Sequence, residues 1–593
     1  MSSREEVIFR DGGWLTLGGP AGTVEARTRG EVLPALAEVE ARVERDKLHA
    51  AGFIGYEAAG AFDPALRTRP PEGFPLLRFG FYRRLRETAP PQASGRDAFP
   101  DWTPSVSETE YRRAVAAVRE KIARGETYQV NYTYRLFAPF TGEGRDLFAR
   151  MAGGQGGTGA FLDFGRCQVA SASPELFFRR EGERIVTRPM KGTARRGRTG
   201  REDARLARRL AGSVKDRAEN LMIVDLLRND LGRIAETGSV AAGPLFEIES
   251  YPTLFQMTST VTARTRASLP GILSALFPCG SVTGAPKPST MGIIADLETT
   301  PRRVYTGAVG LVSPGGRALF LVAIRTLLID REAGRAEYGV GGGIVWDSRA
   351  GAEYAESRLK ARIVAGDRPA FSLLETLGWT PEGGYSLLDR HLERMGKSAR
   401  HFRFPFDPAR ARRLLGKRAR SFPPGPRLVR LLLGPDGALS CSDFPLPARA
   451  DPGPLRVAFA LSPVDSGDSF LRHKTTRREI YEAARKERPG FDEVILYNER
   501  GEVTEATASN IVIGKNGELF TPPLFSGLLP GTLRAELVAG GELRERVILR
   551  EELAGAEAIF LINSVRGRRR AVLIEPASGP GNRPRPQRPK PSG

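Results

Sequence analysis

Cysteine and histidine are scarce in this chain. Its 593 residues contain three cysteines, Cys167, Cys279 and Cys441, and four histidines. Three widely separated cysteines predict neither a disulfide framework nor a zinc knuckle, which favours a reducing compartment. The histidines show no spacing that is typical of a metal site.

Long apolar runs are also absent. The longest run, near residues 318–324, is too short to cross a membrane. Residues 1–10 lack the apolar core of a signal peptide. These absences predict a soluble, cytoplasmic protein with no membrane partner.

The charge balance is basic, because Lys+Arg 89 against Asp+Glu 69 gives a net charge of +20. Such an excess is typical of nucleic-acid-binding proteins when it gathers on one face. Here the basic residues are mostly arginines, spread along the chain and mixed with acids, and neither an RNA-binding signature nor zinc-finger spacing is present. No nucleic-acid partner is expected. A nucleic-acid-binding or scaffold protein stays the third alternative.

The length predicts more than one domain, since 593 residues exceed what a single hydrophobic core usually supports. A Gly-Asp-Arg-Pro break near residues 364–370 separates a first domain, residues 1–365, from a second, residues 371–574. Residues 575–593 are mainly Pro, Gly, Arg and Lys. This segment cannot bury enough apolar surface to fold, so we expect a disordered basic tail.

Local patterns predict helices and strands together, an α+β fold. Ser107 and Glu110 form a capping-box pattern ahead of apolar residues at helical spacing, and Gly125 is suited to end that helix. The other predicted elements are a strand over 128–134, a helix over 203–232, strands over 305–312 and 318–329, and a helix over 353–363.

The most informative stretch is residues 189–193, which places Lys191 close to a proline and a glycine. Both of these residues constrain the backbone. Glu175 lies sixteen positions upstream, and an antiparallel hairpin would bring the two side chains into one pocket. A positioned amine beside a positioned acid is what covalent addition chemistry needs. The alternative is a surface lysine after a turn.

Further blocks share the first domain with this stretch. In order they are residues 128–131 (YQVN), 173–175 (SPE), 189–193 (PMKGT), 218–226 (AENLMIVDL), 280–287 (GSVTGAPK) and 341–345 (GGGIV). Over about residues 50–363 the chain thereby resembles the chorismate-utilising enzymes, and within them the component I group of aminodeoxychorismate synthases. The resemblance implies a layered β-sandwich with flanking helices.

The same resemblance implies that the first domain binds and aminates chorismate. Lys191 would add at C2 while the C4 hydroxyl, protonated by Glu175, leaves, and ammonia would then enter at C4 and expel the lysine. Lys191 must be uncharged to attack, so we expect its pKa below the reference of ~10.4. The related anthranilate synthases usually carry alanine in place of Lys191 and a catalytic histidine in place of Gln256. Both positions favour the aminodeoxychorismate reaction.

Three glutamates on predicted helices are implied to hold Mg²⁺: Glu219, Glu353 and Glu356. Hard oxygen ligands suit this ion, which would bridge to the ring carboxylate of the substrate. Solvated helix faces are the alternative.

Arg325 lies in a predicted apolar strand, where a buried arginine requires an anionic partner. The resemblance implies that it binds a substrate carboxylate. The other residues implied to bind substrate are Lys360, Tyr305, Thr283, Gly341 and Gly342.

The three cysteines lie in no recognisable nucleophile elbow, so no glutaminase is predicted. Ammonia is therefore expected from solution or from a separate glutamine amidotransferase subunit.

The second domain carries its own ordered motifs, at residues 388–395 (LDRHLERM), 473–477 (HKTTR), 503–510 (VTEATASN) and 529–534 (LPGTLR). These resemble the fold-type IV pyridoxal-phosphate enzymes, which have two subdomains. The resemblance implies that Lys474 forms a Schiff base with the cofactor and moves the substrate proton, and that Glu505 pairs with the pyridine nitrogen. Residues implied to bind the phosphate are Arg394, Thr532, Leu533 through its backbone N–H, and Ser564.

The two resemblances together predict a bifunctional enzyme. The first domain would make 4-amino-4-deoxychorismate, and the second would act as the lyase that releases pyruvate and 4-aminobenzoate for folate synthesis. The runner-up is an anthranilate-type synthase joined to an amino-acid transaminase. A homodimer through the second domain is an additional expectation.

Overall fold

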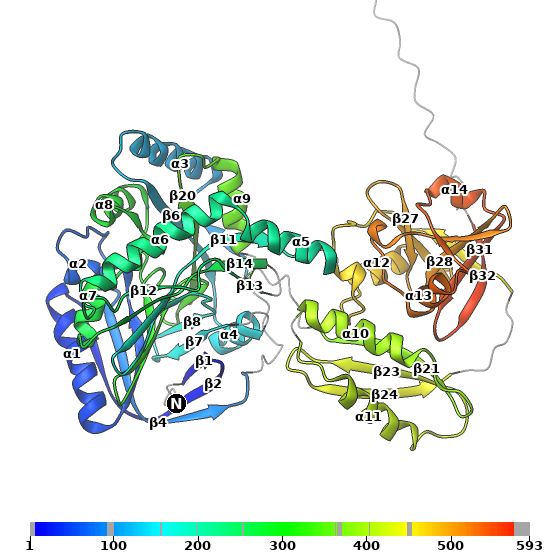
Figure 1. Ribbon diagram of the computed structural model, residues 1–593, viewed down its shortest axis with the longest axis horizontal. Coiled ribbons are helices and arrows are strands. Elements are labelled where there is room, and N and C mark those ends of the chain that lie inside the picture. The colour runs from blue at the N-terminus through cyan, green and yellow to red at the C-terminus, as the bar shows by residue number, and fades with distance from the viewer. Residues whose placement is uncertain are drawn as a thin grey trace, which may run out of the picture. The chain divides into compact units, whose positions relative to one another are not determined.

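The computed structural model describes residues 6–91, 100–153, 157–197, 200–251, 254–361, 363–364, 371–402, 404–446 and 453–574. The chain divides into two compact units, residues 1–370 and 371–593 (Figure 1). The predicted tail at 575–593 lies outside the described residues. None of the described helices combines the length and the apolar character that a membrane-spanning helix requires.

A large, mostly antiparallel sheet system forms the centre of the first unit. Its described strands are β1 (Val7–Asp11), β2 (Gly13–Ala26), β3 (His49–Ile54), β4 (Leu77–Thr88), β5 (Thr103–Pro104), β6 (Gln129–Pro139), β7 (Gly159–Asp163), β8 (Cys167–Ser171), β9 (Leu176–Glu181), β10 (Arg184–Arg188), β12 (Ala241–Ala242), β15 (Val261–Arg264), β16 (Gly284–Ala285), β17 (Ala308–Ser313), β18 (Arg317–Val322), β19 (Thr326–Asp330) and β20 (Arg335–Ile344). A smaller sheet pairs β11 (Met190–Arg195) and β13 (Glu247–Ser250) with β14 (Leu254–Thr258).

Helices flank these sheets (Figure 1). They are α1 (Arg29–Asp46), α2 (Ala59–Phe62), α3 (Glu108–Ala123), α4 (Gly144–Gly153), α5 (Gly200–Ala211), α6 (Val214–Gly232), α7 (Leu269–Leu276), α8 (Lys287–Leu297) and α9 (Ala350–Ala361), with 3₁₀ turns η1 (Tyr56–Ala58) and η2 (Gly280–Val282). At the start of α3 the Ser107 side chain accepts a hydrogen bond from the Glu110 backbone, and the Glu110 carboxylate accepts one from the Ser107 backbone. The predicted capping box is therefore confirmed.

Two predicted elements are each divided in two. Residues 203–232 are not one helix, because the chain breaks at Gly212 and Ser213, and the Ser213 hydroxyl caps α6 by accepting from the Asp216 N–H at 3.3 Å. The strand predicted over 318–329 ends at Val322 and restarts at Thr326. Between them Arg325 has a φ of 50°, a left-handed conformation that cannot continue a strand. Arg325 thus lies in a bend and not in the predicted apolar strand.

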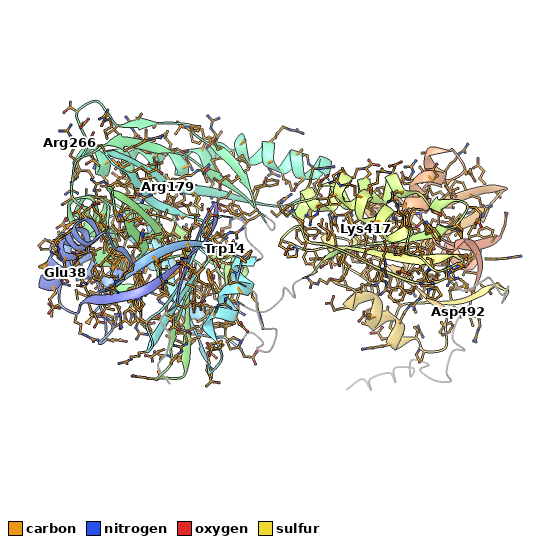
Figure 2. All side chains as sticks on the ribbon, turned by 90° about the horizontal axis from the view of Figure 1, so that it is seen from below. Trp14, Glu38, Arg179, Arg266, Lys417 and Asp492 are labelled. Carbon is orange, nitrogen blue, oxygen red and sulfur yellow. The ribbon has the colours of Figure 1, made fainter. Side chains whose placement is uncertain are left out.

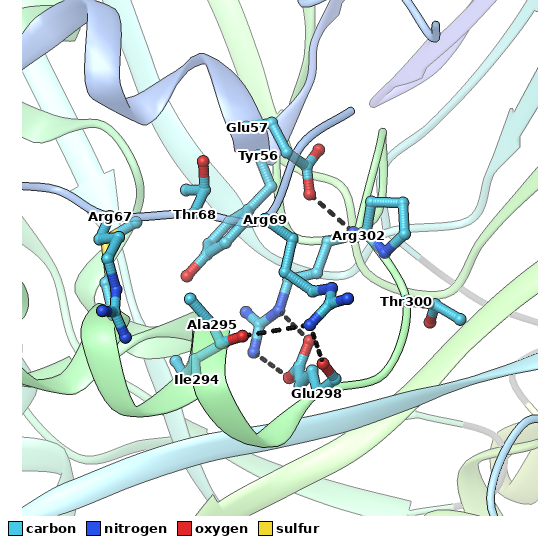
Figure 3. A pocket seen from close by; sticks show the side chains of 12 residues that line it. Tyr56, Glu57, Arg67, Thr68, Arg69, Ile294, Ala295, Glu298, Thr300 and Arg302 are labelled. Atoms are coloured by element: carbon cyan, nitrogen blue, oxygen red, sulfur yellow. Dashed lines mark hydrogen bonds and ion pairs between the residues drawn. The ribbon is translucent and has the colours of Figure 1, made fainter. Parts of the chain in front are cut away.

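A buried ion pair lies among the core strands of the first unit. Glu298 and Arg302 are 3% and 1% exposed, and their closest oxygen–nitrogen distance is 2.6 Å. Figure 3 shows both side chains at a small pocket that Glu57 also lines. The Glu57 carboxylate accepts hydrogen bonds from the backbone N–H groups of Arg302 and Arg303. The charged groups of Glu57, Glu298 and Arg302 therefore have partners within the protein.

The second unit contains two sheets, as expected for two subdomains. One is antiparallel, with β21 (Leu373–Thr380), β22 (Gly384–Tyr385), β23 (Arg427–Leu433) and β24 (Leu439–Pro445), and its helices are α10 (Leu388–Phe402) and α11 (Pro408–Ala419). The other contains β25 (Leu455–Phe459), β26 (Glu493–Tyr497), β27 (Val503–Ala506), β28 (Asn510–Lys515), β29 (Glu518–Thr521), β30 (Arg544–Glu545), β31 (Ala558–Asn563) and β32 (Gly567–Leu573). The remaining described helices are η3 (Ser469–Arg472), α12 (Glu479–Glu487), η4 (Leu524–Ser526), α13 (Thr532–Ala539) and α14 (Arg550–Ala554).

Charged side chains of both signs are spread over the chain. Figure 2 labels Glu38, Arg179 and Arg266 in the first unit, and Lys417 and Asp492 in the second. Many arginines have acidic partners; for example, Arg179 pairs with Asp11 at 2.5 Å. Because many basic side chains have an acidic partner nearby, surfaces with charges of both signs are compatible with a net charge of +20.

The buried pair generates a stability prediction. Glu298→Gln removes the carboxylate but leaves Arg302 charged and buried, so we expect the first unit to lose about 3–5 kcal/mol of unfolding free energy. Glu108→Gln is the matched control, since Glu108 and Arg112 form an i,i+4 pair at half-exposed positions. This control should leave the urea midpoint unchanged. Equal midpoints for the two variants would contradict a stabilising role for the buried pair.

Candidate active sites

A bulge in strand β11 presents Lys191. The pairing of β11 with β14 shifts register between Met190 and Thr193, and Gly192 has a φ of 87°. Gln256 holds the bulge, because its Nε2 donates to the Gly192 carbonyl at 3.1 Å and the Thr193 hydroxyl donates to its Oε1 at 3.3 Å. A β-bulge re-aims the side chain that it carries. Gln256 therefore fixes the strand from which Lys191 projects.

Glu175 lies just before β9, and the β9–β10 hairpin leads towards Lys191, as predicted. The side chain is 3% exposed, and its Oε1 has no hydrogen-bond partner among the described residues. Burial raises the pKa of Glu175 to about 7, although a hydrogen bond from Ser281 and the charge of Lys191 oppose the shift. A carboxyl group in this state can hold a proton near neutral pH and donate it.

Lys191 experiences the opposite shift. Burial lowers the pKa of its amine, and the negative charges of Glu219 and Glu175 only partly offset this effect. A Cβ built on Gly343 would lie 3.3 Å from the Lys191 Nζ and 2.5 Å from the Gln129 Nε2. The Gln129 amide is buried without a hydrogen-bond partner among the described side chains. An amine and an unpartnered amide thus border one space, which suits a polar ligand.

The three predicted metal ligands each have another partner. The Glu356 carboxylate is 2.9 Å from the Lys360 Nζ, Glu353 accepts a hydrogen bond from the Ser348 hydroxyl at 2.7 Å, and Glu219 lies 3.8 Å from the Lys215 Nζ. In the described part of the chain, no group of three or more His, Cys, Asp or Glu side chains is gathered closely enough to hold a metal ion.

The glutamates are nevertheless close enough to influence one another or Lys191 electrostatically. Burial raises the pKa of Glu353, and the nearby charge of Glu356 adds to that shift. Both Glu219 and Glu356 act on the pKa of Lys191. Their oxygen donors are of the kind that Mg²⁺ prefers. The donor chemistry fits Mg²⁺, but Lys360 supplies the positive charge at Glu356.

Predicted substrate residues lie on several segments. The Gly341 carbonyl accepts from the Lys360 Nζ at 3.0 Å, and a Cβ on Gly342 would face Glu353 Oε2 at 3.6 Å and Lys360 Nζ at 3.7 Å. This end of β20 therefore meets α9. The Thr283 hydroxyl, in contrast, donates to backbone carbonyls of its own turn at 3.2 and 3.3 Å.

Arg325 and Tyr305 share a neighbour, Tyr338, whose phenol interacts electrostatically with both. Burial lowers the pKa of the Arg325 guanidinium. Tyr305 packs over Gly339, where a Cβ would approach its ring to 2.2 Å, and the Arg135 guanidinium lies 4.9 Å from the ring centroid. Gly339 is thus required for the close packing of Tyr305.

In the second unit, Lys474 and Glu505 form a second pair with opposite shifts. Burial, assisted by the charge of Arg394, lowers the pKa of Lys474 to about 8. Burial raises the pKa of Glu505 to about 7. The Tyr481 hydroxyl donates to Glu505 Oε1 at 2.8 Å. The Lys474 carbonyl accepts from the Leu374 N–H at 2.9 Å, which anchors its loop to β21.

The predicted phosphate residues converge on one region. Thr532 is the first residue of α13 and Leu533 the second, where backbone N–H groups are free of helical partners. The Ser564 hydroxyl is 3.0 Å from the His391 Nε2, and Arg394 contacts the Glu375 carboxylate at 2.6 Å. Gly531 precedes α13, and a Cβ there would overlap the Asn510 amide at 1.8 Å. The buried Lys474 amine, the buried Glu505 carboxyl and the Arg394 guanidinium, which donates to the Pro530 carbonyl ahead of α13, are groups of the kind that pyridoxal phosphate requires.

The sequence patterns do not assign a role to four residues of these sites: Gln129, Glu375, His391 and Tyr481. Gln129 and His391 stand inside motifs quoted above, and His391 precedes Arg394 by one helical turn. No local sequence pattern indicates a role for Glu375 or Tyr481, because their hydrogen-bond partners lie on other elements. Glu375, on β21, binds both His391 and Arg394 of α10.

Comparison with known proteins gives two family matches. The model described as chorismate binding enzyme matches residues 7–366, and the model described as amino-transferase class IV matches residues 372–574. The anthranilate synthase component I structure from Streptococcus pneumoniae TIGR4 has a TM-score of 0.53 and 25% identity, covering 62% of this chain and 93% of that chain. The expected families and fold class are confirmed.

Two curated relatives match the first unit. Aminodeoxychorismate synthase of Streptomyces griseus is 45% identical over 278 residues, which cover 45% of this chain and 36% of that protein. Aminodeoxychorismate synthase component 1 of Escherichia coli (strain K12) is 40% identical over 260 residues, 43% of this chain and 57% of that protein. The chain thus spans less than two thirds of the length of these relatives.

Proposed function

Because the chain belongs to the chorismate binding enzymes and carries a class IV aminotransferase domain, we propose that it converts chorismate into 4-aminobenzoate in two steps. The first unit would replace the C4 hydroxyl of chorismate by an amino group. The second would remove pyruvate from the resulting 4-amino-4-deoxychorismate. The observation that carries the proposal is Lys191, a lysine whose pKa is lowered beside Glu175, an acid whose pKa is raised to about 7.

In the first step the neutral Lys191 amine would attack C2 of the chorismate ring. The two ring double bonds would shift, and the C4 hydroxyl would leave as water with the proton of Glu175. Ammonia would then attack C4, the double bonds would shift back, and the Lys191 amine would leave C2. Two displacements preserve the configuration at C4. Gln256 would position Lys191 through the bulge at Gly192.

The anthranilate reaction is the alternative for this unit, and one solved neighbour is an anthranilate synthase component I. Amination without a lysine nucleophile would leave Lys191 unused. A histidine would also be expected to act as a base, whereas Gln256 has no titratable group. The residues present therefore favour 4-amino-4-deoxychorismate.

Magnesium is part of the proposal for the first unit. Glu219, Glu353 and Glu356 would hold it, and its charge would offset their repulsion of an anionic substrate. Arg325, Lys360, Tyr305, Thr283, Gly341 and Gly342 are proposed to contact the substrate. Ammonia would come from a separate glutamine amidotransferase subunit, in keeping with the name component 1 of the Escherichia coli relative.

For the second unit we propose a pyridoxal-phosphate-dependent lyase that acts as a homodimer in the cytoplasm. When bound, pyridoxal phosphate supplies an aldehyde that reacts with amines and a ring that stabilises negative charge. Lys474, with a pKa of about 8, would take the proton from C4 of the substrate ring. The enolpyruvyl group would then leave as pyruvate and the ring would become aromatic. A transaminase, which uses the same residues, is the second candidate.

Lys191→Ala should abolish formation of 4-amino-4-deoxychorismate, because no amine can then add at C2. Some anthranilate-type product is expected from direct attack of ammonia. The measurement is chromatography of the products from chorismate, ammonia and Mg²⁺. Lys121→Ala, which alters a lysine paired with Glu126 away from the block, should retain full activity. Full 4-aminobenzoate production by Lys191→Ala would refute the nucleophile.

Glu219→Gln and Glu356→Gln should each raise the Mg²⁺ concentration that gives half-maximal activity, since each variant removes a proposed ligand charge. Direct binding can be followed by electron paramagnetic resonance with Mn²⁺ as the probe. Glu120→Gln is the control, because that carboxylate lies in an exposed pair with Arg124. Unchanged metal dependence and Mn²⁺ affinity in both variants would show that these glutamates are not ligands.

Lys474→Ala should lose the covalent adduct that borohydride reduction traps, while the synthase step continues. The variant should accumulate 4-amino-4-deoxychorismate and release little pyruvate. Peptide mass mapping of the wild-type adduct identifies the lysine, and Lys515→Ala, at a surface pair with Glu552, should behave as wild type. An adduct on another lysine would refute the site. Abundant 4-aminobenzoate from Lys474→Ala would refute the lyase assignment.

A further inference from the structure

A buried imidazole links four elements of the second unit. His391, on α10, is 1% exposed, and its Nδ1 lies 2.6 Å from the Oε2 atom of Glu375 on β21. The same carboxylate accepts from Arg394 through Nε at 2.9 Å and Nη2 at 2.6 Å. A carboxylate with these partners is an acceptor only, so Nδ1 of His391 carries a proton. Glu375 thereby selects the tautomer of the imidazole.

The other face of His391 meets two hydroxyl groups. Its Nε2 lies 3.0 Å from the Ser564 Oγ, beyond β31, and 3.3 Å from the Thr532 Oγ1, at the start of α13. With Nδ1 protonated, the Nε2 of a neutral imidazole is only an acceptor. A hydroxyl that hydrogen-bonds to this Nε2 must then be the donor, with its hydrogen directed towards His391.

This arrangement restricts what the hydroxyls can do for a ligand. Each hydroxyl has one hydrogen, so a hydroxyl that donates to Nε2 offers only lone pairs to its other side. Lone pairs repel an anion. If Nε2 is protonated, it donates to a hydroxyl oxygen, and the hydrogens of Thr532 and Ser564 become free to donate elsewhere.

We propose that His391 takes up one proton from solvent when a phosphate group binds at Thr532 and Ser564, so that both hydroxyls turn their hydrogens to the anion. His391 is thus a positioning residue for the phosphate of pyridoxal phosphate. The inference rests on the proposed cofactor role of the second unit.

The charges around the imidazole determine the direction in which the affinity for the anion changes with pH. Burial lowers the pKa of His391, the charge and hydrogen bond of Glu375 oppose this, and Arg394 and Lys474 lower it further. The free protein therefore holds a neutral His391 at pH values above that lowered pKa. A bound dianion adds negative charge, which raises the pKa of His391 and draws in a proton. Affinity for the anion should consequently fall as pH rises through the pKa of the bound state.

The test is the affinity of the full chain, freed of cofactor, for pyridoxal phosphate from about pH 5.5, below the ordinary pKa of histidine, to about pH 9. In wild type, affinity should fall by up to about tenfold per pH unit more steeply than in His391→Gln. Calorimetry in buffers of different ionisation enthalpy should detect uptake of one more proton by wild type than by the variant. The phosphate group and Lys474 titrate in both proteins, so the difference isolates His391.

His49→Gln is the matched control, because it removes a histidine from the first unit and should keep the wild-type pH profile. His391→Asn provides a second test should His391→Gln fail to fold. Equal pH slopes and equal proton uptake in wild type and variant, with the cofactor bound to both, would overturn this inference alone. No binding of pyridoxal phosphate to wild type would overturn the proposed cofactor role and the inference together.

Discussion

The buried pair of Glu298 and Arg302 is the interaction on which the first unit depends. The Arg302 guanidinium donates to the carbonyls of Asn131 at 2.6 Å and Val282 at 2.9 Å, and Glu298 accepts from the Thr133 backbone N–H at 2.9 Å. These contacts tie strand β6 to the turn that precedes β16. Strand β6 in turn pairs with β20, which carries Gly343 beside Lys191. A buried charge is costly unless it is paired, so these segments are held together as a set.

Both proposed sites depend on the same physical effect, which is the burial of ionisable groups. In each unit burial removes water from an amine and an acid, which lowers the pKa of the lysine and raises the pKa of the glutamate. Neutral amines and protonated acids are the forms that chemical steps need near neutral pH. The units differ in what surrounds the pair. After burial, the largest influence on the pKa of Lys191 is the negative charge of Glu219, whereas the largest influence on the pKa of Lys474 is the positive charge of Arg394.

Local structure followed the sequence where neighbouring residues decide it. The capping box at Ser107 and the hairpin that leads from Glu175 to Lys191 are set by residues close in the chain. The sequence pattern predicted the wrong element boundaries where a single residue interrupts an otherwise regular helix or strand. Ser213 competes as a helix cap within a helical pattern, and the left-handed Arg325 ends a strand whose apolar pattern continues.

The sequence by itself determined the two families, the mixed fold class and the identity of the residues proposed for chemistry, because these depend on residue types in order along the chain. Only the tertiary structure decided how those residues are held. Gln256 supports the bulge at Lys191 from another strand, and Glu375 binds both His391 and Arg394 across an element boundary. Partners of this kind are far apart in sequence and leave no local pattern. Burial, and with it each shifted pKa, is likewise a property of the assembled core.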